Sequence, residues 1–175
     1  MIERIIIAGA GGQGVMLLGK VIAQSALREK KFVTWFPCYG AEVRGGAAYC
    51  MVVISAEEIG SPYIEQAGTL IALNGPALAK FKSRLRSGGT IILNSSLAGA
   101  TRIKGARVIA RPFTALAAQM GNIKVANMLA LGSLLAATKT LRLESALAAI
   151  NDIAPEDKKG LVAINQSALR KGMRL

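Results

Sequence analysis

Residues 4–14 read RIIIAGAGGQG, and this stretch decides the fold class. Arg4–Ala8 is a short aliphatic run that glycines stop, which predicts a buried strand. The glycines contain the G-x-G-x-x-G spacing, and from Val15 to Arg28 apolar residues recur at helical spacing. A strand, a glycine turn and a helix in this order predict the opening unit of a Rossmann-like α/β domain.

Strands and helices alternate over the first two thirds of the chain. Further aliphatic or aromatic runs predict strands at Phe32–Phe36, Ala48–Ile54, Thr69–Leu73, Thr90–Leu93 and Arg107–Ala110. Apolar spacing and terminators predict helices at Ala77–Arg86 (ended by Gly88-Gly89), Thr114–Met120, Ala126–Thr138, Leu143–Ile153 and Pro155–Arg170. We therefore expect a single domain over residues 1–175. It would hold an open, mainly parallel sheet, helices on both faces and a helical C-terminal third.

The composition suits this architecture. The chain has 175 residues, of which 52% are apolar and only 5% aromatic, so aliphatic side chains fill the core. It carries 22 Lys and Arg against 10 Asp and Glu, a formal charge of +12. The basic residues are scattered and no aromatic stripe is interleaved with them, which argues against nucleic acid. Two alternatives remain: a solvated basic surface, or a docking surface for an acidic subunit or a phosphorylated cofactor.

Several site classes are excluded by residue counts. The chain has two cysteines and no histidine, so it lacks the ligands for a conventional zinc site or a four-cysteine iron–sulfur cluster. We expect no metal site and two reduced thiols, with Cys38 a small buried residue, although spacing alone does not exclude a disulfide. The N-terminus does not read as a signal peptide, and Ala126–Thr138 falls short of the roughly 20 residues that cross a bilayer. The expectation is a soluble, cytoplasmic protein that binds neither membrane nor nucleic acid.

The glycine turn by itself leaves its role open. A dinucleotide-binding unit places an acid near the end of its second strand, about 20 residues after the glycines. Residues Lys31–Tyr39 contain no acid, and Glu42 lies too far along, inside a predicted loop. This argues against NAD(P). The turn then binds another phosphate or a partner's backbone, or it is a purely structural tight turn.

Paired glycine loops carry a family resemblance. Gly11–Gly14 (GGQG) and the loop Tyr39–Gly46 (YGAEVRGG) together resemble the gamma subunit of 2-oxoacid:ferredoxin oxidoreductases. Four further segments match the family: Ile59–Pro62, Ala72–Asn74, Asn94–Ser96 and Gly121-Asn122 with Ala126–Met128. The resemblance covers residues 1–135 well. Val33–Pro37 and the Glu42-x-Arg44 pattern look most like the 2-oxoglutarate type, with the pyruvate type close behind. The indolepyruvate type is similar but tends to carry Gln, rather than an acid and a spacer, ahead of Arg-Gly-Gly.

The resemblance implies chemistry shared between subunits. Alpha and beta partners, and in some complexes a ferredoxin-like delta subunit, would hold thiamine diphosphate, Mg²⁺ and iron–sulfur clusters. 2-Oxoglutarate would be decarboxylated oxidatively to succinyl-CoA, with coenzyme A as co-substrate and ferredoxin as electron acceptor. This chain would bind no cofactor alone and supply no catalytic residue.

The residues expected to form a cofactor-binding or interface region come from two loops and two asparagines. They are Gly9, Gly11, Gly12, Gln13, Gly14, Tyr39, Gly40, Glu42, Arg44, Gly45, Gly46, Asn74 and Asn127. For Glu42 and Arg44 the alternatives are a bond within the loop or a contact at a subunit interface. Asparagines at strand ends are also explained by helix caps and turns.

Three other functions stay open at this stage. The same type of complex could act on pyruvate, a branched-chain 2-oxoacid or indolepyruvate. The chain could instead be a free-standing nucleotide-binding regulatory module, or a scaffold that only holds a complex together. An exposed apolar interface could also make the isolated chain homodimerise.

Overall fold

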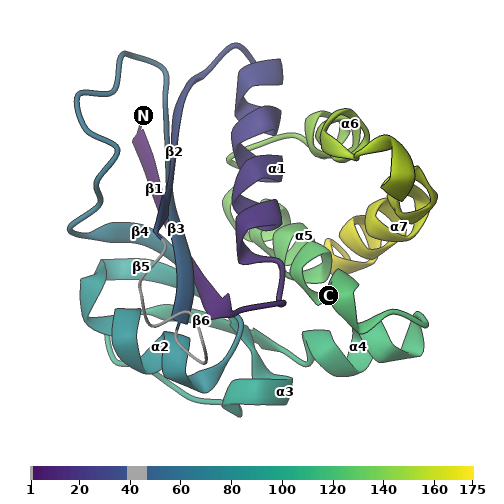
Figure 1. Ribbon diagram of the computed structural model, residues 1–175. Coiled ribbons are helices and arrows are strands. Elements are labelled where there is room, and N and C mark those ends of the chain that lie inside the picture. The colour runs from purple at the N-terminus through teal and green to yellow at the C-terminus, as the bar shows by residue number, and fades with distance from the viewer. Residues whose placement is uncertain (1, 39–46) are drawn as a thin grey trace.

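The computed structural model describes residues 2–38 and 47–175, so the predicted loop Tyr39–Gly46 lies outside the described residues. The six strands are β1 (Ile2–Ala10), β2 (Phe32–Cys38), β3 (Ala47–Ser55), β4 (Ala67–Ala72), β5 (Leu85–Asn94) and β6 (Arg107–Arg111). They form one sheet in the order β2-β3-β1-β4-β5-β6 (Figure 1). Strands β1, β4, β5 and β6 are parallel, while β3 is antiparallel to both of its neighbours. The sheet is therefore mixed but mainly parallel, as predicted.

Helices cover both faces of the sheet, which confirms the expected layers. They are α1 (Val15–Arg28), α2 (Gly75–Phe81), α3 (Ser95–Ala98), α4 (Phe113–Gln119), α5 (Ala126–Thr138), α6 (Leu143–Ile153) and α7 (Val162–Gly172). Short 3₁₀ turns are η1 (Lys82–Arg84), η2 (Ile123–Val125) and η3 (Glu156–Leu161). The larger layer is built on α1 and the C-terminal helices, while α2 packs on the opposite face.

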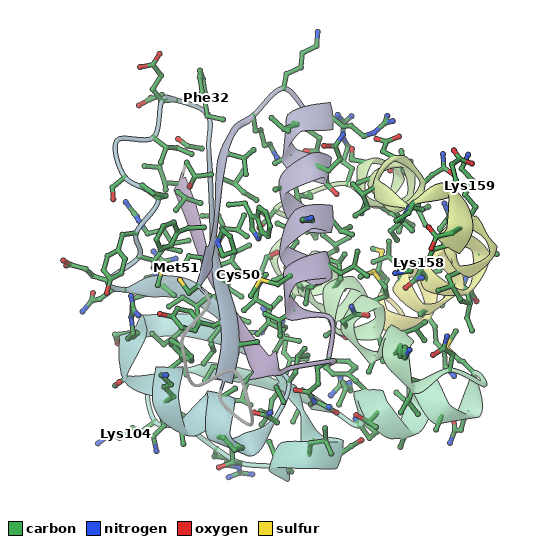
Figure 2. All side chains as sticks on the ribbon, viewed as in Figure 1. Phe32, Cys50, Met51, Lys104, Lys158 and Lys159 are labelled. Atoms are coloured by element: carbon green, nitrogen blue, oxygen red, sulfur yellow. The ribbon has the colours of Figure 1, made fainter. Side chains whose placement is uncertain are left out.

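Alternation along β1 explains why both faces are covered. Ile5 and Ile7 pack with α1 and the C-terminal helices, whereas Ile6 and Ala8 pack with α2. All four are completely buried, because successive side chains of a strand point to opposite faces. On β3 the same rule holds: Figure 2 shows the sulfur atoms of Cys50 and Met51 on opposite sides of the strand, with Cys50 toward α1.

Helix α5 is the centre of the larger layer. Every residue from Asn127 to Leu135 is buried, so the helix is covered on all sides. It crosses α7 at two glycines: a β-carbon built on Gly132 would overlap the Leu169 carbonyl, and one built on Gly172 would overlap the Leu129 carbonyl. At 13 residues α5 is nevertheless short, and within residues 2–38 and 47–175 no helix combines the length and apolarity needed to cross a membrane.

Several predicted boundaries are wrong. The helix predicted over Pro155–Arg170 is divided into the 3₁₀ turn η3 and the helix α7, which begins only at Val162. Strand β2 does not stop before Pro37 but continues through Cys38, because β2 is an edge strand on which a missing N–H costs no ladder bond. The helix predicted to run to Arg86 ends as α2 at Phe81, and β5 already begins at Leu85. The Gly88-Gly89 pair lies inside β5, where Gly88 has a φ of 75° and the pairing with β4 shifts register.

Candidate functional site

The candidate site lies at the carboxyl ends of β1 and β4. These strands are parallel neighbours. After β1 the chain continues to β2, toward one edge of the sheet, whereas after β4 it continues to β5, toward the opposite edge. Such a reversal opens a crevice in which α/β proteins commonly bind ligands. The glycine turn Gly9–Gly14 follows β1, and Asn74 follows β4. The topology thus brings together two of the segments predicted as site residues.

Gln13 ties the glycine turn to the end of β4. Its side-chain Oε1 accepts hydrogen bonds from the Ala10 backbone N–H, at 2.6 Å, and from Asn74 Nδ2, at 3.2 Å. Its Nε2 donates to the Leu73 carbonyl at 3.4 Å. A β-carbon on Gly9 would stand 2.7 Å from Gln13 Oε1 and 3.1 Å from Leu73 Cβ, so a larger residue there would displace the Gln13 amide from the turn. Gln13 is therefore a structural clamp of the turn.

Asn74 has the capping role that the sequence analysis kept as an alternative. Its Oδ1 accepts from the Ala77 N–H at 2.9 Å and so caps α2, where Pro76 occupies the first turn. The same side chain also reaches Gln13 through Nδ2. Asn74 thus holds two neighbouring turns together.

Asn94 belongs to the same network, although we did not include it among the expected site residues. It is 1% exposed at the end of β5 and donates to the Leu73 carbonyl at 3.1 Å and to Thr114 Oγ1 at 2.9 Å. Its Oδ1 accepts from the Thr114 N–H at 3.3 Å. The Asn94–Ser96 motif was the available signal. A buried asparagine at the end of the next parallel strand is expected to join its neighbours.

Asn127 approaches the glycine turn from a distant part of the chain. It lies in the first turn of α5, is 1% exposed, and donates from Nδ2 to the Gly14 carbonyl at 3.2 Å across 113 residues. Gly14 has a φ of 74°, and a β-carbon there would overlap the Asn127 amide. The two predicted site residues therefore fit one another, and only glycine suits both the backbone and the contact.

The outer part of the turn is open. Gly11 and Gly12 are exposed, and a β-carbon on either would meet no atom within 4 Å. Gly14 offers no side-chain cap, and the first turn of α1 carries no acid. Backbone N–H groups at such a helix start suit an anion or a partner's carbonyl groups.

The described residues of this site include no side chain that can donate or accept a proton in a reaction. The glycines, Gln13, Asn74, Asn94 and Asn127 do not titrate, so they can bind and position but not act as general acid or base. Over residues 2–38 and 47–175, no group of three or more His, Cys, Asp or Glu side chains is placed to hold a metal ion. The other predicted site residues fall outside the described residues: Tyr39, Gly40, Glu42, Arg44, Gly45 and Gly46.

The two cysteines are free thiols, as predicted. Cys50 lies opposite Pro37 and Cys38 opposite Tyr49, so the two thiols point to opposite faces of the β2–β3 ladder and cannot form a disulfide. Cys50 is buried, whereas Cys38 is only half-buried, so its predicted full burial is wrong. The reason is that β2 is an edge strand.

The thiols are expected to differ sharply in reactivity. Burial raises the pKa of the Cys50 thiol to about 12. At pH 8 only about one Cys50 in ten thousand would then be a thiolate, the form that reacts. Ellman's reagent should titrate one thiol per native chain within minutes and two in denaturant. The Cys38→Ser variant should show none until it unfolds, and two fast thiols in the native protein would contradict this assignment.

Comparison with known proteins identifies the family. The sequence profile of the family described as "Pyruvate ferredoxin/flavodoxin oxidoreductase" matches residues 4–175. The chain belongs to this family. The resemblance predicted from the paired loops is thereby confirmed, and the match extends into the C-terminal helices, beyond residue 135.

Individual relatives within the family agree. The chain is 34% identical over 173 residues to the 2-oxoglutarate synthase subunit KorC of Methanothermobacter marburgensis, with 93% of each chain covered. It is 38% identical over 133 residues to the ketoisovalerate oxidoreductase subunit VorA of the same organism, covering 76% of this chain but 28% of VorA. The chain thus spans under a third of that relative's length. The solved gamma subunit of a keto/oxoacid ferredoxin oxidoreductase from Geobacter sulfurreducens superimposes with a TM-score of 0.85 at 30% identity, covering 98% of this chain and 96% of that one.

Proposed function

We propose that this chain is the gamma subunit of a multi-subunit 2-oxoacid:ferredoxin oxidoreductase that converts 2-oxoglutarate to succinyl-CoA. The observation that carries the proposal is the end-to-end similarity to KorC, in which 93% of both chains align. The partners would be alpha and beta subunits, with a ferredoxin-like delta subunit in some complexes, and ferredoxin would receive the electrons. The complex would work in the cytoplasm.

Within such a complex, this chain would bind and orient rather than react. Its two cysteines, one of them buried, do not fit an iron–sulfur cluster, which takes four ligands. Thiamine diphosphate, Mg²⁺ and the clusters would therefore belong to partner subunits and supply the carbanion and electron-transfer chemistry. The open turn at Gly11 and Gly12, clamped from behind by Gln13 and Asn127, would face an anionic group of coenzyme A or a partner's backbone.

A second substrate class has one observation in its favour. The VorA relative is more similar in sequence, at 38% identity, although the match covers only 28% of it. A branched-chain 2-oxoacid such as ketoisovalerate is therefore the competing substrate. We favour 2-oxoglutarate because the KorC match covers 93% of both chains, whereas the VorA match covers 76% of this chain and 28% of VorA.

The test is reconstitution under anaerobic conditions. Reduction of a viologen dye would be followed with 2-oxoglutarate and coenzyme A for this chain alone, for the partner subunits alone, and for the mixture. We expect activity in the mixture only, with 2-oxoglutarate preferred over ketoisovalerate and pyruvate. A preference for ketoisovalerate would support the second candidate. Inactive mixtures together with no co-elution would refute membership of the complex, and tight binding of a nucleotide by the isolated chain would then favour a regulatory module.

A further inference from the structure

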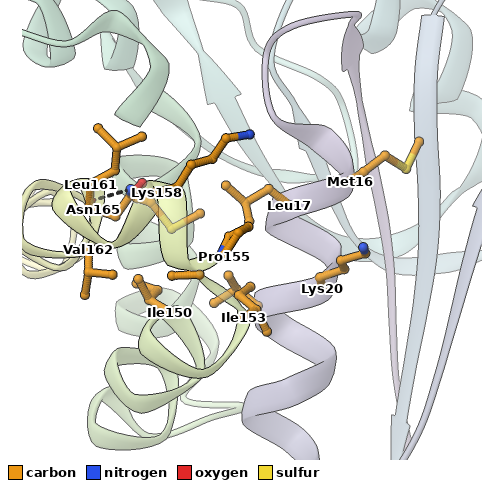
Figure 3. Close-up of a pocket in the computed structure, with 13 residues that line it drawn as sticks. Met16, Leu17, Lys20, Ile150, Ile153, Pro155, Lys158, Leu161, Val162 and Asn165 are labelled. Carbon is orange, nitrogen blue, oxygen red and sulfur yellow. Dashed lines mark hydrogen bonds between the residues drawn. The ribbon is translucent and has the colours of Figure 1, made fainter.

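An apolar groove lies between α1 and the C-terminal helices, outside the site described above. Its volume is about 350 Å³. The floor includes Met128 of α5, and the walls include Leu17 of α1, Ile153 at the end of α6, and Leu161 and Val162 where η3 passes into α7. Figure 3 shows Leu17 of α1 close to Pro155, with Leu161 and Val162 on the other side of these two residues from α1.

The rim of the groove exposes large apolar side chains. Leu17 is 40% exposed and Leu161 is 44% exposed. Another side of α1 already packs in the core, where Leu18 and Ile22 are completely buried. Two exposed leucines on facing elements form a continuous apolar surface with the groove between them, and such patches commonly mark interaction sites.

The charged side chains that line the groove are lysines. Among the described residues, its lining includes Lys20 and Lys158 but no Asp or Glu, although Glu156 and Asp157 precede Lys158 in η3. The neighbouring Lys159 forms an ion pair with Glu156 at 2.6 Å and does not line the groove. Lys158 instead extends from η3 toward α1, above Leu17 in Figure 3. The Lys20 ammonium instead lies 5.3 Å from the centre of the Trp35 ring, on the side of α1 that faces β2, so Lys158 is the lysine that can meet an occupant of the groove.

We infer that this groove docks an amphipathic, acidic segment of a partner subunit, with apolar side chains between Leu17 and Leu161 and a carboxylate at Lys158. The inference rests on the proposed function, because it needs a multi-subunit complex. Two properties of the groove select this occupant. Its apolar lining suits apolar side chains, and a carboxylate of the partner can form an ion pair with Lys158 on a chain whose net charge is +12. A second copy of this chain fits poorly, because a two-fold contact would bring Lys158 and the same net charge to both sides.

Paired variants test the docking. Leu17→Asn and Lys158→Glu change the groove, while Leu27→Asn and Lys159→Glu make the same substitutions outside it; Leu27 is a 56% exposed leucine on the same helix. We expect each groove variant to raise the Kd for the purified partner subunits by about tenfold, and each control by less than about twofold. The Lys158→Glu effect should shrink at 0.5 M salt, whereas the Leu17→Asn effect should not. Unchanged melting temperatures would show that all four variants fold.

A crosslink identifies the occupant directly. A photo-reactive benzoylphenylalanine in place of Leu161, in the assembled complex, should link to one partner peptide that carries Asp or Glu beside apolar residues. A link to a second copy of this chain, or to a peptide without acids, would overturn the inference. So would equal affinities of the groove variants and the wild type for the partners. A wild-type chain that binds no partner would instead refute the proposed function itself, together with this inference.

Discussion

Replacing Gly132 with alanine is expected to lower the free energy of unfolding by about 3 kcal/mol, because the added methyl group has no space between α5 and α7. The new β-carbon would overlap the Leu169 carbonyl and stand 2.7 Å from the backbone carbon of Gly172 and from Met173 N. These are backbone atoms of a packed helix, so the helices must separate. Alanine's better helix propensity, worth about 1 kcal/mol, offsets only part of this loss.

Urea unfolding of the isolated chain measures this effect, and Gly160→Ala is its matched control. Gly160 lies in η3 with no atom within 4 Å of a built β-carbon and no positive φ, so its stability should change by less than about 0.5 kcal/mol. The separation of α5 and α7 should also weaken the buried bond from Ser133 Oγ to the Gly172 carbonyl, now 3.1 Å. Equal stability of the two variants would show that α5 and α7 do not pack through these glycines.

Replacing Gly14 with alanine is expected to cost about 2 kcal/mol, because two penalties coincide at this residue. The backbone is left-handed, with a φ of 74°, and the new β-carbon would overlap the Asn127 amide. Asn127 is buried and would lose its bond to the Gly14 carbonyl. The glycine turn and the start of α5 should therefore loosen together.

A double-mutant cycle separates the two penalties. Asn127→Ala removes the amide that the new β-carbon would meet, so the double variant should lose less stability than the sum of the single variants. Gly11→Ala is the control in the same turn, because its β-carbon would meet nothing within 4 Å and its φ is not positive. Strict additivity, or an equal loss from Gly11→Ala, would show that Gly14 and Asn127 are not coupled.

Local patterns were sufficient for much of the fold. The aliphatic run of β1, the glycine turn and the spacing of α1 predicted these elements correctly, with α1 bounded at Val15 and Arg28 as observed. Each depends on a short-range property: alternation, helical period, or the conformational freedom of glycine. The family was indicated by the resemblance of the paired loops and of four further segments to known gamma subunits. Pro37 and Gly88 misled the prediction because their effect depends on the place of a strand in the sheet, which local sequence does not encode.

The sequence by itself determined the strand–turn–helix opening, the mainly parallel sheet and the family. Only the tertiary structure decided which distant groups meet. It placed Asn127 on the Gly14 carbonyl, buried Cys50 beneath α1, and set Leu17 across a groove from Leu161. The physical reason is the separation along the chain between the residues that interact. Strand and helix patterns reflect neighbours a few residues apart, whereas these contacts depend on how helices pack on the sheet, and close packing couples side chains more than 100 residues apart.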